Sequence, residues 1–461
     1  MPTIAEVLQG GWRLHQTGRL EDAEQIYRRV LAQIPDQPEA LVYLGIAQFD
    51  QRQFDQSAAS YRRALAIRSE FPIAWNNLGN SLRMLGQVNE AEACFAKALE
   101  QDPKYLSAYK NRGTLWIWSG EIERGMQWYQ RGLELDPQNA ELHRNLGVIQ
   151  LLLGNYHVGW PEYRWRWQMP GAIRPQVAAP LWQGEPLQGK TILLYPEQGR
   201  GDAIQFVRMT KVLSDSGARV VFRCPADLIP LFTSAHGVQM LLPEGAAIGP
   251  VDYHASLIDT VDIWYTLHHQ MPYAGELAAA GYLNVSAPLV AYWQRWLDSL
   301  PNLSAQKVGI NWQGNPDHHA DVYRSLPLAA LQPLSKLPGV SLFSLQFGFG
   351  SEQLEGCDFA DAIVRLPDDA DSSGGAFTDT AAIIKNLDVV VTSDTAIAHL
   401  AGALGVRVIM MLGKVPDWRW LTQGETTPWY PSMRLVRQPA MGSWDAVVNQ
   451  VAEIISGGLD W

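Results

Sequence analysis

The chain has 461 residues, of which 47% are hydrophobic, so it is long enough for two to four domains with apolar cores. Its formal net charge is −11 with acidic and basic residues interspersed, which excludes a general affinity for nucleic acid and requires a local site for any anionic ligand. The three cysteines are too far apart for a metal-binding motif or a disulfide framework, so we expect a reducing compartment. No signal segment and no run of about 18 apolar residues is found, so we expect a cytoplasmic protein without a transmembrane segment.

The first 170 residues repeat with a period of 34, which is typical of tetratricopeptide repeats. A glycine in one helix lets two helices approach closely, and an aromatic residue in the next helix fills the gap, so such units stack into a superhelix with a concave face. We expect four regular repeats and a fifth that ends in "GWPEYRWRW", where Pro161 interrupts the second helix. The recurring residues are Gly11, Gly45, Gly79, Gly113 and Gly147, and Tyr27, Tyr61, Phe95, Tyr129 and Tyr163.

One polar position also recurs in three successive repeats, at Asn77, Asn111 and Asn145. Side-chain amides both donate and accept hydrogen bonds, so a row of them can bind a peptide backbone. The row resembles the asparagine ladder in the tetratricopeptide part of O-linked N-acetylglucosamine transferases, and the resemblance implies that these residues bind the acceptor. The alternative interpretation is that asparagine is merely tolerated at this repeat position.

From Gly189 onward, short apolar runs alternate with amphipathic stretches, which predicts a parallel α/β fold. A helical segment followed by a polar turn, residues 288–306, divides this region into two lobes with a cleft between them. In such sheets, ligands bind beyond the carboxyl ends of the strands. The predicted strands are 191–196, 218–224, 238–243, 307–314, 340–347, 387–394 and 407–413, and the predicted helices include 202–215, 325–337 and 377–386.

Two short motifs are rejected because their context is wrong. Residues 184–191, "GEPLQGKT", match a phosphate-binding loop, but they precede a predicted strand and no helix follows them. Asp369 and Asp371 form a D-x-D sequence in an acidic loop, which we interpret as a solvated turn rather than a metal site.

The tripeptide Ser393-Asp394-Thr395 lies between a predicted strand and a predicted helix. The free N–H groups and the dipole of a helix N-terminus favour an anion such as phosphate. Thr395 and His399 are four residues apart and therefore share one helical face, and the next predicted strand ends beside Lys414. The alternative interpretation is that Ser393 or Asp394 caps the helix and that His399 packs internally.

"SDTAIAHLAGALG" resembles the nucleotide-sugar motif of the bacterial heptosyltransferase family, and "PEQGRGDAIQFVRM" resembles its first-strand Gly-Asp loop. These are inverting glycosyltransferases with two Rossmann-like lobes of the GT-B type, and the resemblance covers roughly residues 189–450. Together with the repeats, "GWPEYRWRW" and "PDWRW" are similar to bacterial tetratricopeptide-containing glycosyltransferases. The resemblance implies a repeat domain over 1–170, an acceptor-side lobe over 171–290 and a donor-side lobe over 291–461.

The same resemblance assigns roles to single residues. Asp202 would be the catalytic base, with Glu197 as the second candidate; the alternative role of Asp202 is to cap the helix 202–215. The family usually has glycine at the position of Ala396 and lysine at the position of Arg324. The donor-binding residues are expected to be Arg324, Asp394, Thr395, Ala396, His399 and Lys414. Arg324 and Lys414 would neutralise the diphosphate in place of a metal ion. Four tryptophans follow presumed strand ends: Trp312, Trp418, Trp420 and Trp429. Their flat rings could stack on a nucleobase or a sugar; the alternative is that they pack internally.

The expected activity is inverting, metal-independent transfer of a hexosyl or heptosyl group from a nucleotide sugar, with no other cofactor, to a protein or peptide held by the repeats. The alternative is an interaction scaffold with a nucleotide-binding but inactive transferase-like domain. Ala396 favours the scaffold, whereas Asp202, Arg324 and His399 favour the enzyme. The nucleobase, the sugar and the acceptor stay open.

Overall fold

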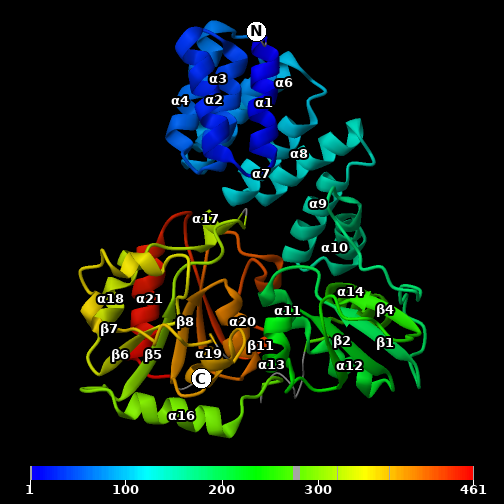
Figure 1. Ribbon diagram of the computed structural model, residues 1–461, viewed down its shortest axis with the longest axis vertical. Coiled ribbons are helices and arrows are strands. Elements are labelled where there is room, and N and C mark those ends of the chain that lie inside the picture. Colours follow the sequence, from blue (N-terminus) through cyan, green and yellow to red (C-terminus); the bar gives the residue numbers. More distant parts are fainter. Residues whose placement is uncertain (1–2, 274–280, 319, 373, 460–461) are drawn as a thin grey trace. The chain divides into compact units, whose positions relative to one another are not determined.

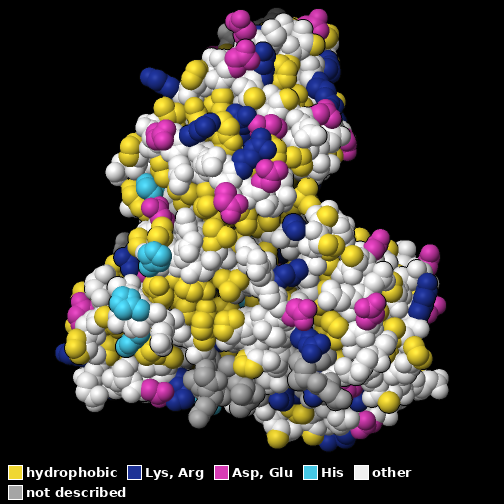
Figure 2. All heavy atoms as spheres, turned by 180° about the vertical axis from the view of Figure 1, so that it is seen from behind, with side chains coloured by type: hydrophobic (Ala, Val, Ile, Leu, Met, Phe, Trp, Pro, Cys, Tyr) yellow, Lys and Arg dark blue, Asp and Glu magenta, His cyan; other side chains and the backbone are white. Residues whose placement is uncertain are grey.

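The computed structural model describes residues 3–273, 281–318, 320–372 and 374–459 (Figure 1). The chain forms two compact units, one with residues up to Ile149 together with Pro161–Ala172, the other with Gln150–Trp160 and the chain from Ile173 onward. Within the described ranges, no helix is long and apolar enough to cross a membrane. Figure 2 shows acidic and basic side chains interspersed over the visible face, as the sequence predicts.

The first part of the chain consists of helical hairpins. In each regular hairpin the predicted glycine lies directly against the predicted aromatic ring: a Cβ on Gly45 would lie 2.7 Å from the ring of Tyr61. The helices are α1 Ile4–Gln16, α2 Leu20–Gln33, α3 Pro38–Asp50, α4 Phe54–Ile67, α5 Pro72–Met84, α6 Val88–Gln101, α7 Leu106–Trp118, α8 Ile122–Leu135, α9 Ala140–Leu152 and α10 Tyr156–Tyr163, followed by the 3-10 helix η1 Arg164–Gln168. The tetratricopeptide superhelix is therefore confirmed.

The fifth hairpin differs from the others, as expected, but not at the predicted residue. Helix α10 has 8 residues, compared with 14 in α4, and it contains Pro161. The helix continues to Tyr163 before it changes to the 3-10 turn η1. Proline removes one backbone donor and crowds the preceding turn, which shortens the helix without ending it at the proline itself.

The second unit contains two sheets. The first has the order β3-β2-β1-β4 and is entirely parallel, with β1 Thr191–Tyr195, β2 Arg219–Cys224, β3 Val238–Pro243 and β4 Tyr253–Ser256. The second has the order β10-β11-β9-β8-β5-β6-β7, and only β10 pairs antiparallel. Its strands are β5 Gln306–Asn311, β6 Val340–Ser344, β7 Ile363–Val364, β8 Val389–Ser393, β9 Val408–Leu412, β10 Thr426–Thr427 and β11 Tyr430–Arg437.

Helices cover both sheets (Figure 1). They are α11 Arg200–Phe206, α12 Met209–Asp215, α13 Ile229–Phe232, α14 Leu257–His268, α16 Ala287–Asp298, α17 Asp321–Arg324, α18 Gln332–Ser335, α19 Thr378–Ile384, α20 Ala396–Ala403 and α21 Trp444–Ser456, with 3-10 helices η2 Ala226–Leu228, η3 Leu328–Leu331, η4 Ser351–Leu354, η5 Ala360–Ala362 and η6 Trp418–Trp420. The predicted α/β architecture with two lobes is therefore confirmed, with α16 at the predicted division.

Local predictions are confirmed in part. All seven predicted strands occur, and β1 begins at Thr191, so the rejected loop motif does precede a strand. The predicted helix 202–215 is divided into α11 and α12, and 325–337 contains only short turns of helix. The interpretation of the D-x-D loop as a solvated turn is wrong for Asp371, whose carboxylate accepts hydrogen bonds from the backbone of Asp379 and Thr380 at the start of α19.

Candidate functional site

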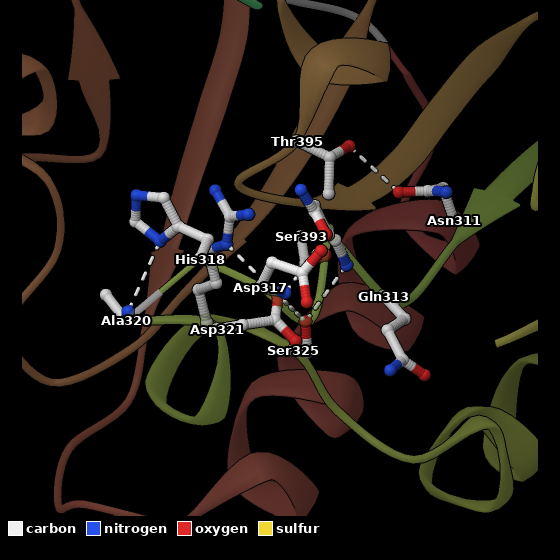
Figure 3. Close-up of polar contacts among 12 residues, drawn as sticks. Asn311, Gln313, Asp317, His318, Ala320, Asp321, Ser325, Ser393 and Thr395 are labelled. Atoms are coloured by element: carbon white, nitrogen blue, oxygen red, sulfur yellow. Dashed lines mark hydrogen bonds and ion pairs between the residues drawn. The ribbon is translucent and has the colours of Figure 1, made fainter. Parts of the chain in front are cut away.

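The carboxyl ends of β5 and β8 meet at Asn311 and Thr395. The Oδ1 atom of Asn311 accepts hydrogen bonds from Thr395 Oγ1 at 2.9 Å and from Thr392 Oγ1 at 3.1 Å (Figure 3). Thr395 is the N-cap residue of α20, and its side chain makes no capping bond. Ser393 Oγ is buried and has no hydrogen-bond partner among the described groups, so Ser393 does not cap the helix either. The helix N-terminus therefore keeps backbone donors for another acceptor.

The loop after β5 brings Arg324 to the same edge. The buried carboxylate of Asp321 accepts from Arg324 Nε at 3.3 Å and from Ser325 Oγ at 2.7 Å. Ser325 Oγ in turn accepts from Gly314 N at 3.0 Å. A Cβ on Gly314 would lie 2.6 Å from the Arg324 guanidinium, so this close approach requires glycine. The charge of Arg324 also acts on Asp394, the residue before Thr395, where it opposes the rise in the pKa of the carboxyl that burial causes.

Gln346 connects the loop after β5 to the loop after β6. Its Oε1 atom accepts from Asn311 Nδ2 at 2.8 Å and from Gln313 N at 3.0 Å, and its Nε2 atom donates to the carbonyl oxygen of Phe349 at 2.7 Å. The side chain is buried, so these bonds are shielded from water. Gln346 therefore holds Asn311 in place beneath Thr395.

Asp394 occupies a cluster of opposing charges. Burial, and then the neighbouring Asp417 carboxylate, raise the pKa of Asp394 to about 6, while Arg324 and Arg419 oppose the rise. An aspartate with this pKa carries a proton in part of the molecules near neutral pH. It therefore repels a phosphate less than an ordinary aspartate does, and it suits a hydrogen bond to a sugar hydroxyl.

The predicted base comes from the other lobe. Asp202 lies in the first turn of α11, which begins at Arg200, so it is not the N-cap residue. Its carboxylate forms an ion pair with Arg419 of η6, and Arg419 also donates to Asp417 at 2.7 Å and to Gln205 Oε1 at 2.6 Å. Burial raises the pKa of Asp202, and Arg419 opposes this effect. A raised pKa suits a general base, because it lies closer to the pH of the reaction.

Helix α11 packs against α20, which places Asp202 near His399. A Cβ on Gly201 would lie 3.0 Å from His399 Cδ2 and 3.6 Å from Ala396 Cα. His399 is 6% exposed; its Nδ1 atom lies 3.0 Å from Tyr430 Oη, and its ring stacks on Trp420. Burial, followed by the charges of three arginines, lowers the pKa of His399 well below its ordinary value, so the imidazole is neutral.

The remaining predicted residues bond or pack within the protein. Lys414 is exposed, and its ammonium donates to the carbonyl oxygen of Pro439 at 3.0 Å. The second candidate base, Glu197, accepts from Ser256 Oγ at 2.6 Å at the end of β4. The four tryptophans proposed for stacking, Trp312, Trp418, Trp420 and Trp429, are all at most 2% exposed and pack internally.

The three repeat asparagines bond to their neighbours within the first unit. Asn111 is buried, and its Nδ2 atom donates to Asn76 Oδ1 at 2.9 Å; Asn76 Nδ2 donates to Asn77 Oδ1 at 3.1 Å. Asn145 Oδ1 accepts from Arg144 at 3.0 Å. The assignment of these residues to an acceptor stays a prediction.

Several site residues were missed by sequence reasoning. Asn311 is the last residue of β5 and Gln346 follows the end of β6, and both carry amides, which was a usable signal. Arg419 lies within the motif "PDWRW", but no role was predicted for this arginine. Tyr430 gave no signal, because only the pairing of β11 with β9 brings it beside His399.

These features define a class: a tetratricopeptide superhelix joined to a two-sheet α/β unit whose site lies at strand carboxyl ends. Residues 8–72, 72–105 and 119–154 match models of the tetratricopeptide repeat, and residues 376–446 match the model of glycosyltransferase family 9 (heptosyltransferase). The chain thus combines tetratricopeptide repeats with a region of the family 9 type, which confirms the resemblance seen in the sequence.

A curated relative, protein FlbA of Caulobacter vibrioides, is 27% identical over 327 residues, which is 66% of this chain and 52% of FlbA. The chain therefore spans about half the length of this relative. Similar solved structures include MamA (18% identity, TM-score 0.30, 34% of this chain and 92% of that chain) and a tetratricopeptide protein of Thermus thermophilus (19%, 0.34, 36% and 91%). A third is PilF of Pseudomonas aeruginosa (18%, 0.35, 46% and 86%).

Proposed function

We propose that the second unit transfers a glycosyl group from a nucleotide sugar, with inversion and without a metal ion, to a protein or peptide that the repeats hold. The observation that carries this proposal is the packing of α11, which contains Asp202, against α20, where Gly201 lies beside Ala396 and His399. This packing supports Asp202 as the general base and the start of α20 as the binding site of the diphosphate.

In this proposal the donor diphosphate lies at the N-terminus of α20. The backbone donors after Thr395 and the guanidinium of Arg324 face its negative charge. Asp394, with its raised pKa, bonds a hydroxyl of the sugar. Lys414 contributes only if its ammonium leaves the carbonyl of Pro439.

The transfer step follows from this placement. Asp202 removes the proton from the acceptor hydroxyl, and the hydroxyl oxygen forms a bond to the anomeric carbon. On the opposite side, the bond from the anomeric carbon to the phosphate oxygen breaks, and the nucleoside diphosphate leaves with the electron pair. Arg324 and the helix donors stabilise the charge that develops on this leaving group.

The experiment has two stages. A thermal-shift panel compares ADP with ADP-glucose, UDP with UDP-glucose and GDP with GDP-mannose. A ligand present at 100 times its dissociation constant should add about 2.7 kcal/mol to the free energy of unfolding. The best donor is then incubated with candidate acceptor proteins, and mass spectrometry detects the added sugar with and without EDTA. We expect a product of inverted anomeric configuration that is insensitive to EDTA. Absence of stabilisation by every pair would contradict the proposal.

One observation favours the alternative of an inactive scaffold. Asp202 is held in an ion pair with Arg419, whose side chain is 7% exposed, and a carboxylate bound in this way must release or share the arginine before it accepts a proton. Donor binding with neither transfer nor hydrolysis of the sugar would support the scaffold. Release of nucleoside diphosphate in a coupled assay would exclude it.

A further inference from the structure

Behind His399 lies a buried row of hydrogen-bonding groups that joins the two lobes. His399 Nδ1 lies 3.0 Å from Tyr430 Oη, and Tyr430 Oη lies 3.3 Å from Tyr282 Oη. Tyr282 Oη lies 3.1 Å from Arg208 Nη2 and 2.9 Å from the carbonyl oxygen of Ile204. All four side chains are at most 6% exposed, so water does not compete for these bonds.

The direction of each bond follows from counting protons, starting at Arg208. A guanidinium only donates, so the Tyr282 oxygen accepts from Arg208. A carbonyl only accepts, so the single hydroxyl proton of Tyr282 is given to Ile204 O, or to Gln205 O at 3.2 Å. Tyr282 therefore has no proton for Tyr430, and the bond between the two tyrosines uses the proton of Tyr430.

This leaves Tyr430 as an acceptor toward His399. The proton between His399 and Tyr430 must then be carried by Nδ1 of the imidazole. In the opposite arrangement, Tyr430 donates to His399, and the two tyrosine oxygens face each other in the interior without a proton between them. A buried hydrogen bond left unmade costs free energy, so the first arrangement is favoured.

The other ring nitrogen, Nε2, is left for a ligand. No group of the described residues bonds His399 Nε2, and Nε2 is not among the enclosed polar atoms. The neighbouring Cδ2 atom lies against Gly201, the residue before the proposed base Asp202. Trp420 stacks on the ring and Tyr430 holds Nδ1, so the edge with Nε2 is the part of the imidazole directed at a substrate.

We infer that His399 is held as the Nδ1–H tautomer, and that the lone pair on Nε2 accepts a hydrogen bond from a hydroxyl of the donor sugar. A lone pair repels a phosphate oxygen, so His399 recognises the sugar rather than the diphosphate. Tyr430, Tyr282 and Arg208 act through His399 as positioning residues. This inference rests on the proposed function, because it names the substrate group bound at the same site.

The charges around the ring support the neutral form that the tautomer requires. Arg419, Arg208 and Arg324 each disfavour a proton on Nε2, and burial adds to their effect. The groups facing the ring from the other packed elements are the hydroxyl of Tyr430 on β11 and the indole of Trp420 on η6. Nε2 therefore stays an acceptor at neutral pH.

The tautomer is tested directly on the whole protein without ligand. Long-range nitrogen–proton correlation spectra of histidine labelled with nitrogen-15 distinguish a protonated Nδ1 from a protonated Nε2, and His399→Gln identifies the resonances. We expect Nδ1–H in the wild type and a shift toward Nε2–H in Tyr282→Phe, which frees the Tyr430 proton for His399. The control is Tyr273→Phe, which removes a half-buried hydroxyl that bonds Tyr156 at 2.8 Å. Nε2–H in the wild type would overturn the inference.

The ligand class is tested by calorimetric titration of each nucleotide sugar in the panel against its own nucleoside diphosphate. His399→Ala should weaken the nucleotide sugar about three- to ten-fold, the effect of one hydrogen bond, and leave the nucleoside diphosphate within about two-fold. Equal weakening of both would show a phosphate contact and overturn the sugar assignment. Failure of the wild type to bind any pair would overturn the proposed function as well, whereas the spectra alone decide the tautomer.

Discussion

Asp202 and Arg419 are 217 residues apart in the chain, yet their side chains form a partly buried ion pair. The pair joins the helix of the proposed base to the segment "PDWRW". The proposed proton transfer and the stability of the contact between the lobes therefore depend on the same two side chains. Removing Arg419 leaves the carboxylate of Asp202 without its cation, which is costly, whereas removing Asp202 leaves Arg419 paired with Asp417. Substitutions here must therefore be compared in binding, turnover and stability together.

Asp202→Asn should separate catalysis from binding. The amide keeps the shape and can still accept from Arg419, but it cannot remove a proton, so transfer should fall about 10²–10⁴-fold while donor affinity persists. Asp227→Asn is the matched control, since Asp227 forms an exposed ion pair with Arg200. Transfer close to the wild-type rate would move the role of base to Glu197.

Arg419→Met should change both stability and pH dependence. The partly buried carboxylate of Asp202 then lacks a cation, which should lower the free energy of unfolding by up to about 3–5 kcal/mol. Because Arg419 lowers the pKa of Asp202, its loss should raise that pKa further and move the acidic limb of the rate profile to higher pH. Arg200→Met, at an exposed pair, should cost no more than about 1 kcal/mol.

His399 should make stability depend on pH. Its pKa in the folded protein lies well below the unfolded value, so below about pH 6.5 the unfolded chain binds the proton that the folded protein refuses. Relative to His399→Gln, the wild type should therefore lose about 1.4 kcal/mol for each pH unit below about 6.5. Urea unfolding of both proteins at pH 5, 6 and 7 measures this difference; parallel stability curves would show that the imidazole is not kept neutral.

At the scale of elements, the repeat helices are set by local pattern, while several elements of the α/β unit depend on their neighbours. The strands 191–195 and 408–412 lie inside continuous apolar runs, which are visible in the sequence. Strand β4 has only 4 residues and contains a histidine and a serine, so it becomes a strand through its pairing with β1. Strand β11 mixes buried and exposed positions and was missed for the same reason.

Two adjacent glycines in α1 test the packing rule of the repeats. A Cβ on Gly11 would lie 2.6 Å from the ring of Tyr27, which is fully buried, whereas a Cβ on Gly10 would meet nothing within 4 Å. Gly11→Ala should destabilise by about 1–3 kcal/mol through overpacking. Gly10→Ala should stabilise by roughly 0.5–1 kcal/mol, because alanine is the better helix former. Denaturant unfolding should thus give opposite signs, and a shared sign would contradict the close approach of the two helices.

For the molecule as a whole, the two units have separate proposed tasks. In a repeat array each unit is stabilised by its neighbours, so the repeats and the α/β unit can be changed independently. The proposed donor site lies entirely within the second unit, and the asparagine row lies within the first. The domain limits drawn from the sequence, 1–170, 171–290 and 291–461, stay predictions, because residues 150–160 cluster with the second unit and 161–172 with the first.

Removing residues 1–139 should leave donor hydrolysis intact and abolish transfer to a protein acceptor. Replacing Asn77, Asn111 and Asn145 by alanine in the full chain should raise the Michaelis constant for the acceptor and leave that for the donor unchanged. Since Asn111 is buried and bonded to Asn76, the unfolding midpoint of the triple variant must be checked in parallel. Unaltered transfer by the truncated protein would show that the lobes alone select the acceptor.

The sequence by itself determined the repeats, the two-lobed α/β region and the helix start at Thr395, because period, apolar runs and strand-to-helix order are local properties of the chain. Only the tertiary structure decided that Arg419 pairs with Asp202, that Tyr430 holds His399 and that Lys414 bonds elsewhere. These contacts join groups distant in the chain, and they depend on strand order and on α11 packing against α20. Burial then shifts the pKa of Asp202, Asp394 and His399, since the dielectric environment of a side chain is a property of the folded protein and not of its residue type.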